Sequence, residues 1–178
     1  MLLFIDTETT GLSVETGQEI IDIAIISEHP DGTIDRWETL IRPERIDLAH
    51  PKALKVNGYT DAAWAEAPFL SEVAEEIFER LSYGNKIVVG HNIQFDMNFI
   101  RHTLKRHITD RKMRLVYPCI DTITLAHEHL TPMGLRTLQL DQIRKFMGWP
   151  MEGAHTAMTD AETVRRLYHS LIRRSWKE

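Results

Sequence analysis

The chain opens on a short apolar run, Leu2 to Ile5, that is followed at once by two acids at alternate positions, Asp6 and Glu8. The run has the length and composition of a buried strand. Because residues two apart in a strand point to the same face, the two carboxylates project together and Thr7 points away. Adjacent carboxylates at the end of a buried strand repel each other and are costly to desolvate. A hard divalent cation such as Mg²⁺ or Mn²⁺ would relieve this repulsion, and two solvated acids are the alternative.

Composition predicts one globular domain over residues 1–178, because 43% of the residues are hydrophobic and no composition shift marks a boundary. No apolar run is long enough to cross a bilayer. The short run at the N-terminus is not preceded by the basic residues with which a signal peptide begins. The single cysteine, Cys119, excludes an internal disulfide and is compatible with a reducing compartment. We therefore expect a cytoplasmic protein without a membrane partner.

The charge distribution excludes one class of nucleic-acid binder. A formal net charge of -5 argues against purely electrostatic binding of a phosphate backbone. It leaves open an enzyme whose acids hold metal ions, since the cations reverse the local field that a phosphate meets. Residues 101–114 contain six basic residues and one acid. This segment is either a solvated face or a surface that follows a nucleic-acid strand.

The pattern of apolar residues predicts a mixed α/β fold. Pro30, Asp31 and Gly32 indicate a turn that joins two strands as a hairpin. Alternating strands and helices follow, which predicts a mixed central sheet that starts with antiparallel strands and is flanked by helices. The expected strands are 2–5, 20–26, 33–41, 86–90 and 115–120, and the expected helices are 70–81, 96–104, 121–131, 135–147 and 156–176. Residues 42–61 are expected to form a loop with one short helical piece.

A second polar cluster, His91 to Asp96, directly follows the strand expected over 86–90 and begins a helix. Ligands in α/β folds usually bind at the carboxyl ends of strands, so we expect this junction to face the same crevice as the two N-terminal acids. Asp96 would lie in the first helical turn, where the helix dipole favours a carboxylate. Asn92 would either cap the helix or contact a ligand.

A third polar cluster, His155 and Asp160, lies at the start of the last expected helix. Positions five apart on a helix differ by about 140°, so the two side chains cannot share a face if both residues are helical. The preceding Gly153 favours a loop, from which the His155 ring could reach over Asp160. An exposed or capping histidine is the alternative.

Taken together, these motifs resemble those of the DEDDh (DnaQ-like) 3′–5′ exonucleases, which have an RNase H-like fold. The motifs are Asp6-x-Glu8-Thr9-Thr10-Gly11, His91-Asn92-x-x-Phe95-Asp96-x-x-Phe99 and His155-x-x-x-x-Asp160, in the family's order and at its approximate separations. The resemblance extends through 19–24, 121–126 and 135–140, and so covers nearly the whole chain. One departure is Asn57-Gly58-Tyr59-Thr60, where the family often has His-Gly-Ile-Thr, and it concerns substrate handling more than catalysis.

The resemblance implies a metal-dependent 3′–5′ exonuclease that releases nucleoside 5′-monophosphates. Its metal ligands would be Asp6, Glu8, Asp96 and Asp160, holding two Mg²⁺ ions with Mn²⁺ as a substitute. Asp6 would bridge both ions, and Glu8 and Asp160 would complete the first. His155 would be the general base, since a histidine of ordinary pKa, about 6.5, can take up a proton near neutral pH. The implied substrate contacts are Thr9, Gly11, Leu12, Asn92 and Phe99.

The expected substrate is a nucleic acid with a free, single-stranded or frayed 3′ end, with DNA favoured over RNA. Several alternatives stay open within this resemblance: an exoribonuclease that trims short RNA or tRNA ends, a proofreading subunit bound to a polymerase, and a DNA-repair enzyme. A homodimer is a further possible assembly. Outside it stand a non-catalytic binding module of the same fold and an endonuclease or transferase with a related metal site. A non-catalytic module would have lost a carboxylate, and none is lost here.

Overall fold

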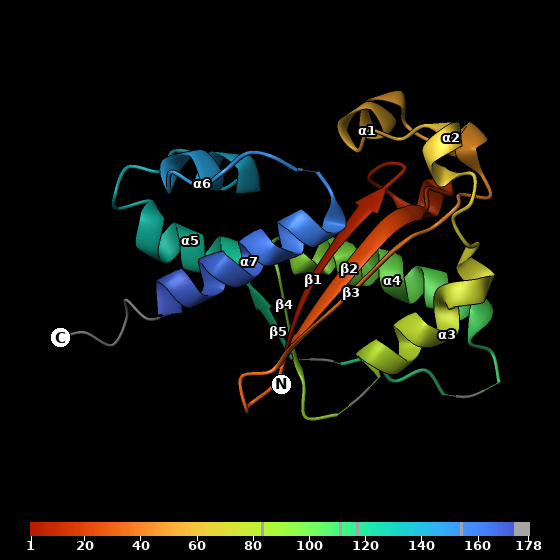
Figure 1. Ribbon diagram of the computed structural model, residues 1–178, viewed down its shortest axis with the longest axis horizontal. Helices are drawn as coiled ribbons and strands as arrows, with labels where there is room; N and C mark the ends of the chain where they lie inside the picture. The colour runs from red at the N-terminus through yellow and green to blue at the C-terminus, as the bar shows by residue number, and fades with distance from the viewer. Residues whose placement is uncertain (83, 111, 117, 154, 173–178) are drawn as a thin grey trace.

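The computed structural model describes residues 1–82, 84–110, 112–116, 118–153 and 155–172 (Figure 1). Its centre is a five-stranded sheet in the order β3-β2-β1-β4-β5. The strands β1, β2 and β3 are antiparallel, and β4 and β5 run parallel to β1. The expected mixed sheet is thus confirmed. The strands are β1 (Leu2–Thr9), β2 (Ile20–Glu28), β3 (Ile34–Leu40), β4 (Ile87–Gly90) and β5 (Cys119–Asp121).

Helices cover both faces of this sheet, and α7 and α4 lie on opposite sides of the strands (Figure 1). The helices are α1 (Pro51–Val56), α2 (Asp61–Trp64), α3 (Leu70–Leu81), α4 (Ile93–His107), α5 (Thr122–Leu130), α6 (Leu140–Phe146) and α7 (Ala157–Ile172). Two short 3₁₀ helices, Val14–Thr16 and Ile46–Leu48, lie in the connections. Within the described residues, no helix has the length and apolar character needed to cross a membrane.

Strand β1 is buried on both faces, which explains its uninterrupted apolar start. Leu3 and Ile5 pack in the cluster that contains residues of α3 and α4, whereas Phe4 packs against α7. The Phe4 ring lies 5.6 Å from the ring of Tyr168 in α7, edge to face. Side chains alternate along a strand, so the residues after Ile5 continue the same alternation. The even-numbered acids of β1 therefore lie on the α7 side of the sheet.

The end of β1 is shaped by its pairing with β2. Glu8 lies opposite Asp22, and the register shifts between Glu8 and Thr9. Such an irregularity bends a strand and re-aims the residues that follow it. The chain after it is fixed to α1, because His50 donates its backbone N–H to the Thr10 carbonyl at 2.7 Å. The turn that follows Glu8 is therefore held against α1.

Three elements differ from the sequence-based expectation. Strand β5 starts at Cys119 and not at 115, because Leu115 pairs with Ser82 and Pro118 has no N–H to donate to a ladder. Helix α6 is shorter than 135–147, since residues 135–139 are extended and the Leu138 carbonyl contacts the His91 ring at 2.6 Å. Residues 42–61 contain all of α1 and the start of α2, more than the single helical piece expected.

The remaining expected elements agree with the structure to within a few residues at their ends. Helix α4 begins at Ile93, a little before its expected start, and runs on to His107. Helix α5 begins after Asp121, whose carboxylate caps it by accepting the Ile123 N–H. Of the C-terminal helix expected over 156–176, the portion after 172 lies outside the described residues. The expectation of one domain over 1–178 stays a prediction.

Candidate active site

The two acids of β1 are half-buried and lie on the α7 side of the sheet. Burial, and after it the charges of Asp160, Asp22 and Asp96, together raise the pKa of Glu8 to about 8. The pKa of Asp6 is raised well above its ordinary value, first by burial and then by the neighbouring acids, of which Asp96 contributes most. Each acid thus lies near other negative charges at a poorly solvated position.

Asp96 reaches the same region from the first turn of α4, as expected, and is 3% exposed. Its Oδ1 accepts two hydrogen bonds from Thr7, from the backbone N–H at 3.0 Å and from the hydroxyl at 2.7 Å. Burial outweighs these hydrogen bonds and raises the pKa of Asp96 to about 7. Thr7 points away from Asp6 and Glu8, as its place in the strand predicts, and there it fixes the carboxylate that α4 supplies.

His155 lies in the loop before α7, as expected, with a left-handed backbone (φ 69°) that follows Gly153 (φ 70°). Asp160 lies in the first turn of α7 and is 9% exposed. Glu8, His155 and Asp160 each place a possible ligand atom so that all three atoms lie within 4.8 Å of one another. Burial raises the pKa of Asp160, although Arg144 and His155 oppose the shift. The loop therefore brings together two side chains that a continuous helix would separate.

The donor set of this site fits a hard divalent cation. Asp6 and Glu8 form no ion pair with a lysine or arginine in the part of the chain that the structure describes. Four carboxylates therefore gather with raised pKa values, and Arg144 is paired with only one of them, Asp160. Carboxylate oxygens with one imidazole are ligands that Mg²⁺, Mn²⁺ or Zn²⁺ accept. The acidic cluster is thus a candidate cation site.

A pocket of about 390 Å³ lies beside Glu8, between the turn after β1 and helix α1. Leu12, which is 85% exposed, and Val56 of α1 supply apolar walls, and Phe95 of α4 also lines the pocket. Asn57 donates its side-chain amide to the Thr9 carbonyl at 2.8 Å and so ties α1 to the turn. The pocket has the size and apolar lining that suit a flat organic ring.

Three of the five expected substrate contacts line the pocket, and the other two do not. Thr9, Gly11 and Leu12 line the pocket. Asn92 is exposed at the start of α4 with a left-handed backbone (φ 65°), and its side chain makes no capping hydrogen bond. Phe99 is 2% exposed and packs in the core against Phe95, with ring centroids 4.9 Å apart. The aromatic ring that lines the pocket is that of Phe95, which is half-buried and lies one helical turn earlier.

The absence of a side chain at Gly11 makes room for a neighbouring side chain. A Cβ atom at this position would lie 2.1 Å from the side chain of Gln18, so the residue allows a close contact within the protein. Gln18 in turn accepts the Ser13 N–H at 2.8 Å, which closes the loop after β1. The space on the Cβ side of Gly11 is therefore filled by the Gln18 side chain.

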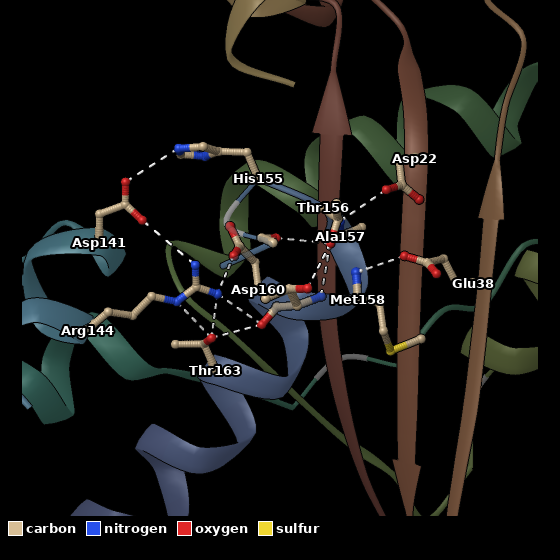
Figure 2. A network of polar contacts seen from close by, with 12 residues as sticks. Asp22, Glu38, Asp141, Arg144, His155, Thr156, Ala157, Met158, Asp160 and Thr163 are labelled. Carbon is tan, nitrogen blue, oxygen red and sulfur yellow. Dashed lines mark hydrogen bonds and ion pairs between the residues drawn. The ribbon is translucent and has the colours of Figure 1, made fainter. Parts of the chain in front are cut away.

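Several residues around the site were not predicted from the sequence. Asp22 accepts the Ala157 N–H at 3.1 Å and Glu38 accepts the Met158 N–H at 3.1 Å, so β2 and β3 hold the start of α7 (Figure 2). On the other side, Arg144 contacts Asp160 (Figure 2). A charged residue inside an apolar stretch is a sequence signal for Asp22, whereas the sequence around Arg144 gives no such signal.

A second hollow, of about 900 Å³, lies between the β2–β3 turn, the segment after α6 and helix α7. Its lining includes Trp149, Arg165 and Glu28, and Arg165 and Glu28 form an ion pair at 3.2 Å. It contains none of the residues that the sequence analysis assigns to the site. Size alone therefore does not locate the acidic cluster.

Comparisons with known proteins agree with this geometry. The sequence matches the Exonuclease (RNase T) family model over residues 3–168. It is 30% identical to the DNA polymerase III subunit epsilon of Treponema pallidum over 167 residues, which are 94% of this chain and 74% of the relative. Among solved structures, Exonuclease X in complex with 5′ overhanging duplex DNA is similar with a TM-score of 0.68 and 25% identity, over 100% of this chain and 95% of that one.

The chain therefore belongs to the exonuclease family, and its enzyme class is that of the 3′–5′ exonucleases. The RNase H-like fold has a further match in E. coli Exonuclease I in complex with a dT13 oligonucleotide, with a TM-score of 0.78. That match is 20% identical and covers 98% of this chain and 41% of the other, so it supports the fold alone. The expected fold class and the expected family are both confirmed.

Proposed function

We propose that this exonuclease removes nucleotides one at a time from single-stranded or frayed 3′ ends of DNA and releases nucleoside 5′-monophosphates. One observation supports this most: the acids of β1, α4 and α7 and the ring of His155 converge beside an apolar pocket. Binding of a terminal nucleotide needs both parts, because the charge of its phosphodiester requires cations and its base requires an apolar surface. The two parts adjoin at Glu8, which belongs to both.

Asp6, Glu8, Asp96 and Asp160 are the residues that would hold the two Mg²⁺ ions, with Mn²⁺ as a substitute. Bound there, such ions supply charge stabilisation for the attacking water and for the leaving oxygen of a phosphoryl displacement. The protein holds the ligands ready: Thr7 fixes Asp96, and the hydrogen bonds to Asp22 and Glu38 fix the helix that presents Asp160.

His155 is the proposed general base. Its side chain is 41% exposed, so an imidazole nitrogen can reach both the water that attacks and the solvent that later receives the proton. The left-handed backbone at His155 turns the side chain toward Glu8 and Asp160, where a scissile phosphate would lie. A histidine takes up the proton as the phosphorus–oxygen bond forms and returns it to solvent after product leaves.

The pocket at Leu12 is the proposed site of the terminal base. A base can enter only when it is unpaired, because the turn after β1 and helix α1 enclose it from two sides. This favours single-stranded or frayed ends over intact duplex ends, since a paired base must first be unstacked. Thr9 and Gly11 shape the turn, and Asn92, exposed at the start of α4, is proposed to contact the strand behind the terminal nucleotide.

Substitution of Leu12 by alanine is expected to raise KM for single-stranded DNA by about fivefold with kcat nearly unchanged, because about 1 kcal/mol of apolar contact is lost in substrate and transition state alike. The matched control is Met133→Ala, which removes an exposed apolar side chain in the turn after α5. Steady-state rates on a 3′-labelled oligonucleotide measure both parameters. Equal KM values for the two variants would remove Leu12 from the substrate contacts.

The relatives support DNA as the substrate and a polymerase as a partner. DNA polymerase III subunit epsilon is part of a DNA polymerase by its name, and Exonuclease X was solved with duplex DNA that has a 5′ overhang. We therefore propose DNA as the polymer, a polymerase or a second copy of the chain as a possible partner, and the cytoplasm as the location. Proofreading is the alternative role that these relatives favour.

The deciding experiment offers four substrates with Mg²⁺ and, in parallel, with EDTA. Three are linear and 5′-labelled: single-stranded DNA, duplex DNA with a mismatched 3′ end, and a short RNA. The fourth is an internally labelled circular single-stranded DNA. We expect a ladder of products shortened from the 3′ end on the first two, mononucleotides with a 5′-phosphate, and an uncut circle. Trimming of RNA alone would make the enzyme an exoribonuclease. A cut circle would indicate an endonuclease, and binding without cleavage would indicate a non-catalytic module.

A further inference from the structure

Helix α6 lies beside the site and contains a buried arginine that the proposed chemistry does not use. The Arg144 side chain is 1% exposed. Its Nη2 lies 2.6 Å from Asp160 Oδ1 and 3.0 Å from the Thr159 carbonyl, and its Nε lies 2.9 Å from the Thr163 hydroxyl (Figure 2). All three partners belong to α7, so one guanidinium spans a full turn of that helix.

Packing alone does not explain an arginine at this position. Next to it, Ile143 packs with Leu167 and Leu171 in an apolar cluster between α6 and α7. An arginine is always charged, and apolar side chains of similar volume often stabilise a protein as well as a buried ion pair does. Unlike an apolar side chain, an arginine also fixes the orientation of a carboxylate, because its N–H donors lie in one plane. A carboxylate has two oxygens, so Arg144 can hold one of them while the other serves a cation.

The contacts of Arg144 continue to the proposed base. Its Nη1 is buried and has no hydrogen-bond partner within the described ranges, and it lies 3.8 Å from the carboxylate of Asp141. Asp141, one turn earlier on α6, lies 3.4 Å from His155 Nε2 (Figure 2). The side chains of His155, Asp141, Arg144 and Asp160 thus follow one another, with charges of alternating sign on the last three.

The sheet and α6 hold different parts of the same segment. Asp22 and Glu38 accept backbone N–H groups of Ala157 and Met158, and so they fix the main chain at the start of α7. Arg144 and Asp141 contact the side chains that project from this segment into the site. Without a counter-charge, the Asp160 carboxylate would be repelled by Glu8 and Asp6, whose pKa values its charge raises. Arg144 provides that counter-charge on the side away from β1.

From this arrangement we infer that α6 supplies two positioning residues for the exonuclease site: Arg144, which orients the Asp160 carboxylate, and Asp141, which orients the His155 ring. The inference rests on the proposed function, because it takes Asp160 as a ligand and His155 as the base. Asp141 beside Nε2 favours the tautomer with hydrogen on that nitrogen, which leaves Nδ1 to accept the proton of the attacking water. Neither α6 residue touches the substrate in this role.

The test compares Asp141→Ala with Asp141→Glu and with Lys145→Gln, an exposed change on the same helix, by steady-state rates on single-stranded DNA with Mg²⁺. Loss of a residue that orients a catalytic group costs about tenfold or more. We expect Asp141→Ala to lower kcat by about that factor with KM unchanged, Asp141→Glu to restore part of it, and Lys145→Gln to match wild type. In a His155→Ala background, Asp141→Ala should have no further effect, because it acts through that ring.

Two more measurements keep folding and activity apart. The ring ¹⁵N shifts of His155, assigned by their loss in His155→Ala and read at pH 8 without metal, should show hydrogen on Nε2 in wild type and averaged tautomers in Asp141→Ala. For the arginine, Arg144→Lys should retain more kcat than Arg144→Met at equal folded fraction, which thermal melting measures.

A fall in kcat that is equally large in the His155→Ala background, or unchanged ¹⁵N shifts, would overturn the assignment of Asp141. Equal kcat for Arg144→Met and wild type, both folded, would overturn that of Arg144. If wild type degrades no substrate, the proposed function fails and this inference falls with it. If wild type is active and Asp141→Ala has the same kcat as wild type, the positioning role is refuted and the proposed function stands.

Discussion

Replacement of Asp6 by asparagine is expected to abolish Mg²⁺-dependent degradation of single-stranded DNA and, at the same time, to make the metal-free protein more stable. Asp6 lies among Asp96, Asp160, Glu8 and Asp22, and its raised pKa shows that the folded chain resists its charge. Asparagine keeps the shape and removes that charge. Activity should fall by more than about a hundredfold, because a carboxylate that would hold the cations of the reaction is lost.

The stability change is the more discriminating half of this prediction. The pKa of Asp6 is raised well above its ordinary value in the folded chain, so Asp6→Asn should raise the free energy of unfolding at pH 8 in EDTA. Denaturant melts measure it. Glu66→Gln, which removes one negative charge at an exposed position, is the control and should alter neither activity nor stability. A destabilised Asp6→Asn protein would mean that the aspartate is a structural residue with its own partners.

In EDTA, wild type is expected to lose stability as the pH rises from about 5 to about 8. Burial and neighbouring acids raise the folded-state pKa of Glu8 from 4.5 to about 8, of Asp96 from 3.8 to about 7, and of Asp22 from 3.8 to about 6. Between the unfolded and the folded values, the folded chain holds more protons than the unfolded chain. Unfolding then releases protons, so the free energy of unfolding falls with rising pH.

Divalent cations should reverse this trend, because they bind the deprotonated acids of the folded state only. Melting temperatures recorded from pH 5 to pH 8 with EDTA, with Mg²⁺ and with Mn²⁺ measure both effects. The rise in melting temperature on adding Mg²⁺ should be larger at pH 8 than at pH 5, and Asp6→Asn should show a smaller rise. A melting temperature in EDTA that climbs toward pH 8 would contradict the arrangement of acids described for the folded chain.

Much of this site follows from short-range rules. Alternation along a strand was enough to place Asp6 and Glu8 on one face with Thr7 on the other. The angle between helical positions showed that His155 and Asp160 cannot share a helix face, and Gly153 favoured a loop at His155. Both rules depend on backbone geometry, which the local sequence largely determines. The resemblance to a family then connected the three motifs, which local rules cannot do.

The parts of the site that could not be predicted depend on how deeply a side chain is buried and on contacts between residues far apart in the sequence. Phe95 and Phe99 are one helical turn apart and lie on the same side of α4, and only the position of the helix end relative to the sheet decides which ring lines the pocket. The shortening of α6 follows from a contact between the Leu138 carbonyl and His91, far away in the sequence. Arg144 reads in the sequence as a surface charge, and its burial is visible only once α6 and α7 are packed.

The placement of β1 between β2 and β4 has a consequence for biosynthesis. The acids of β1 are made before their partners on α7, which belong to the last described helix. Contacts between such distant segments form late and require most of the chain to be present. A nascent chain that lacks α7 would have Asp6 and Glu8 but not the Asp160 carboxylate. The complete acidic cluster therefore forms only after α7 has been made.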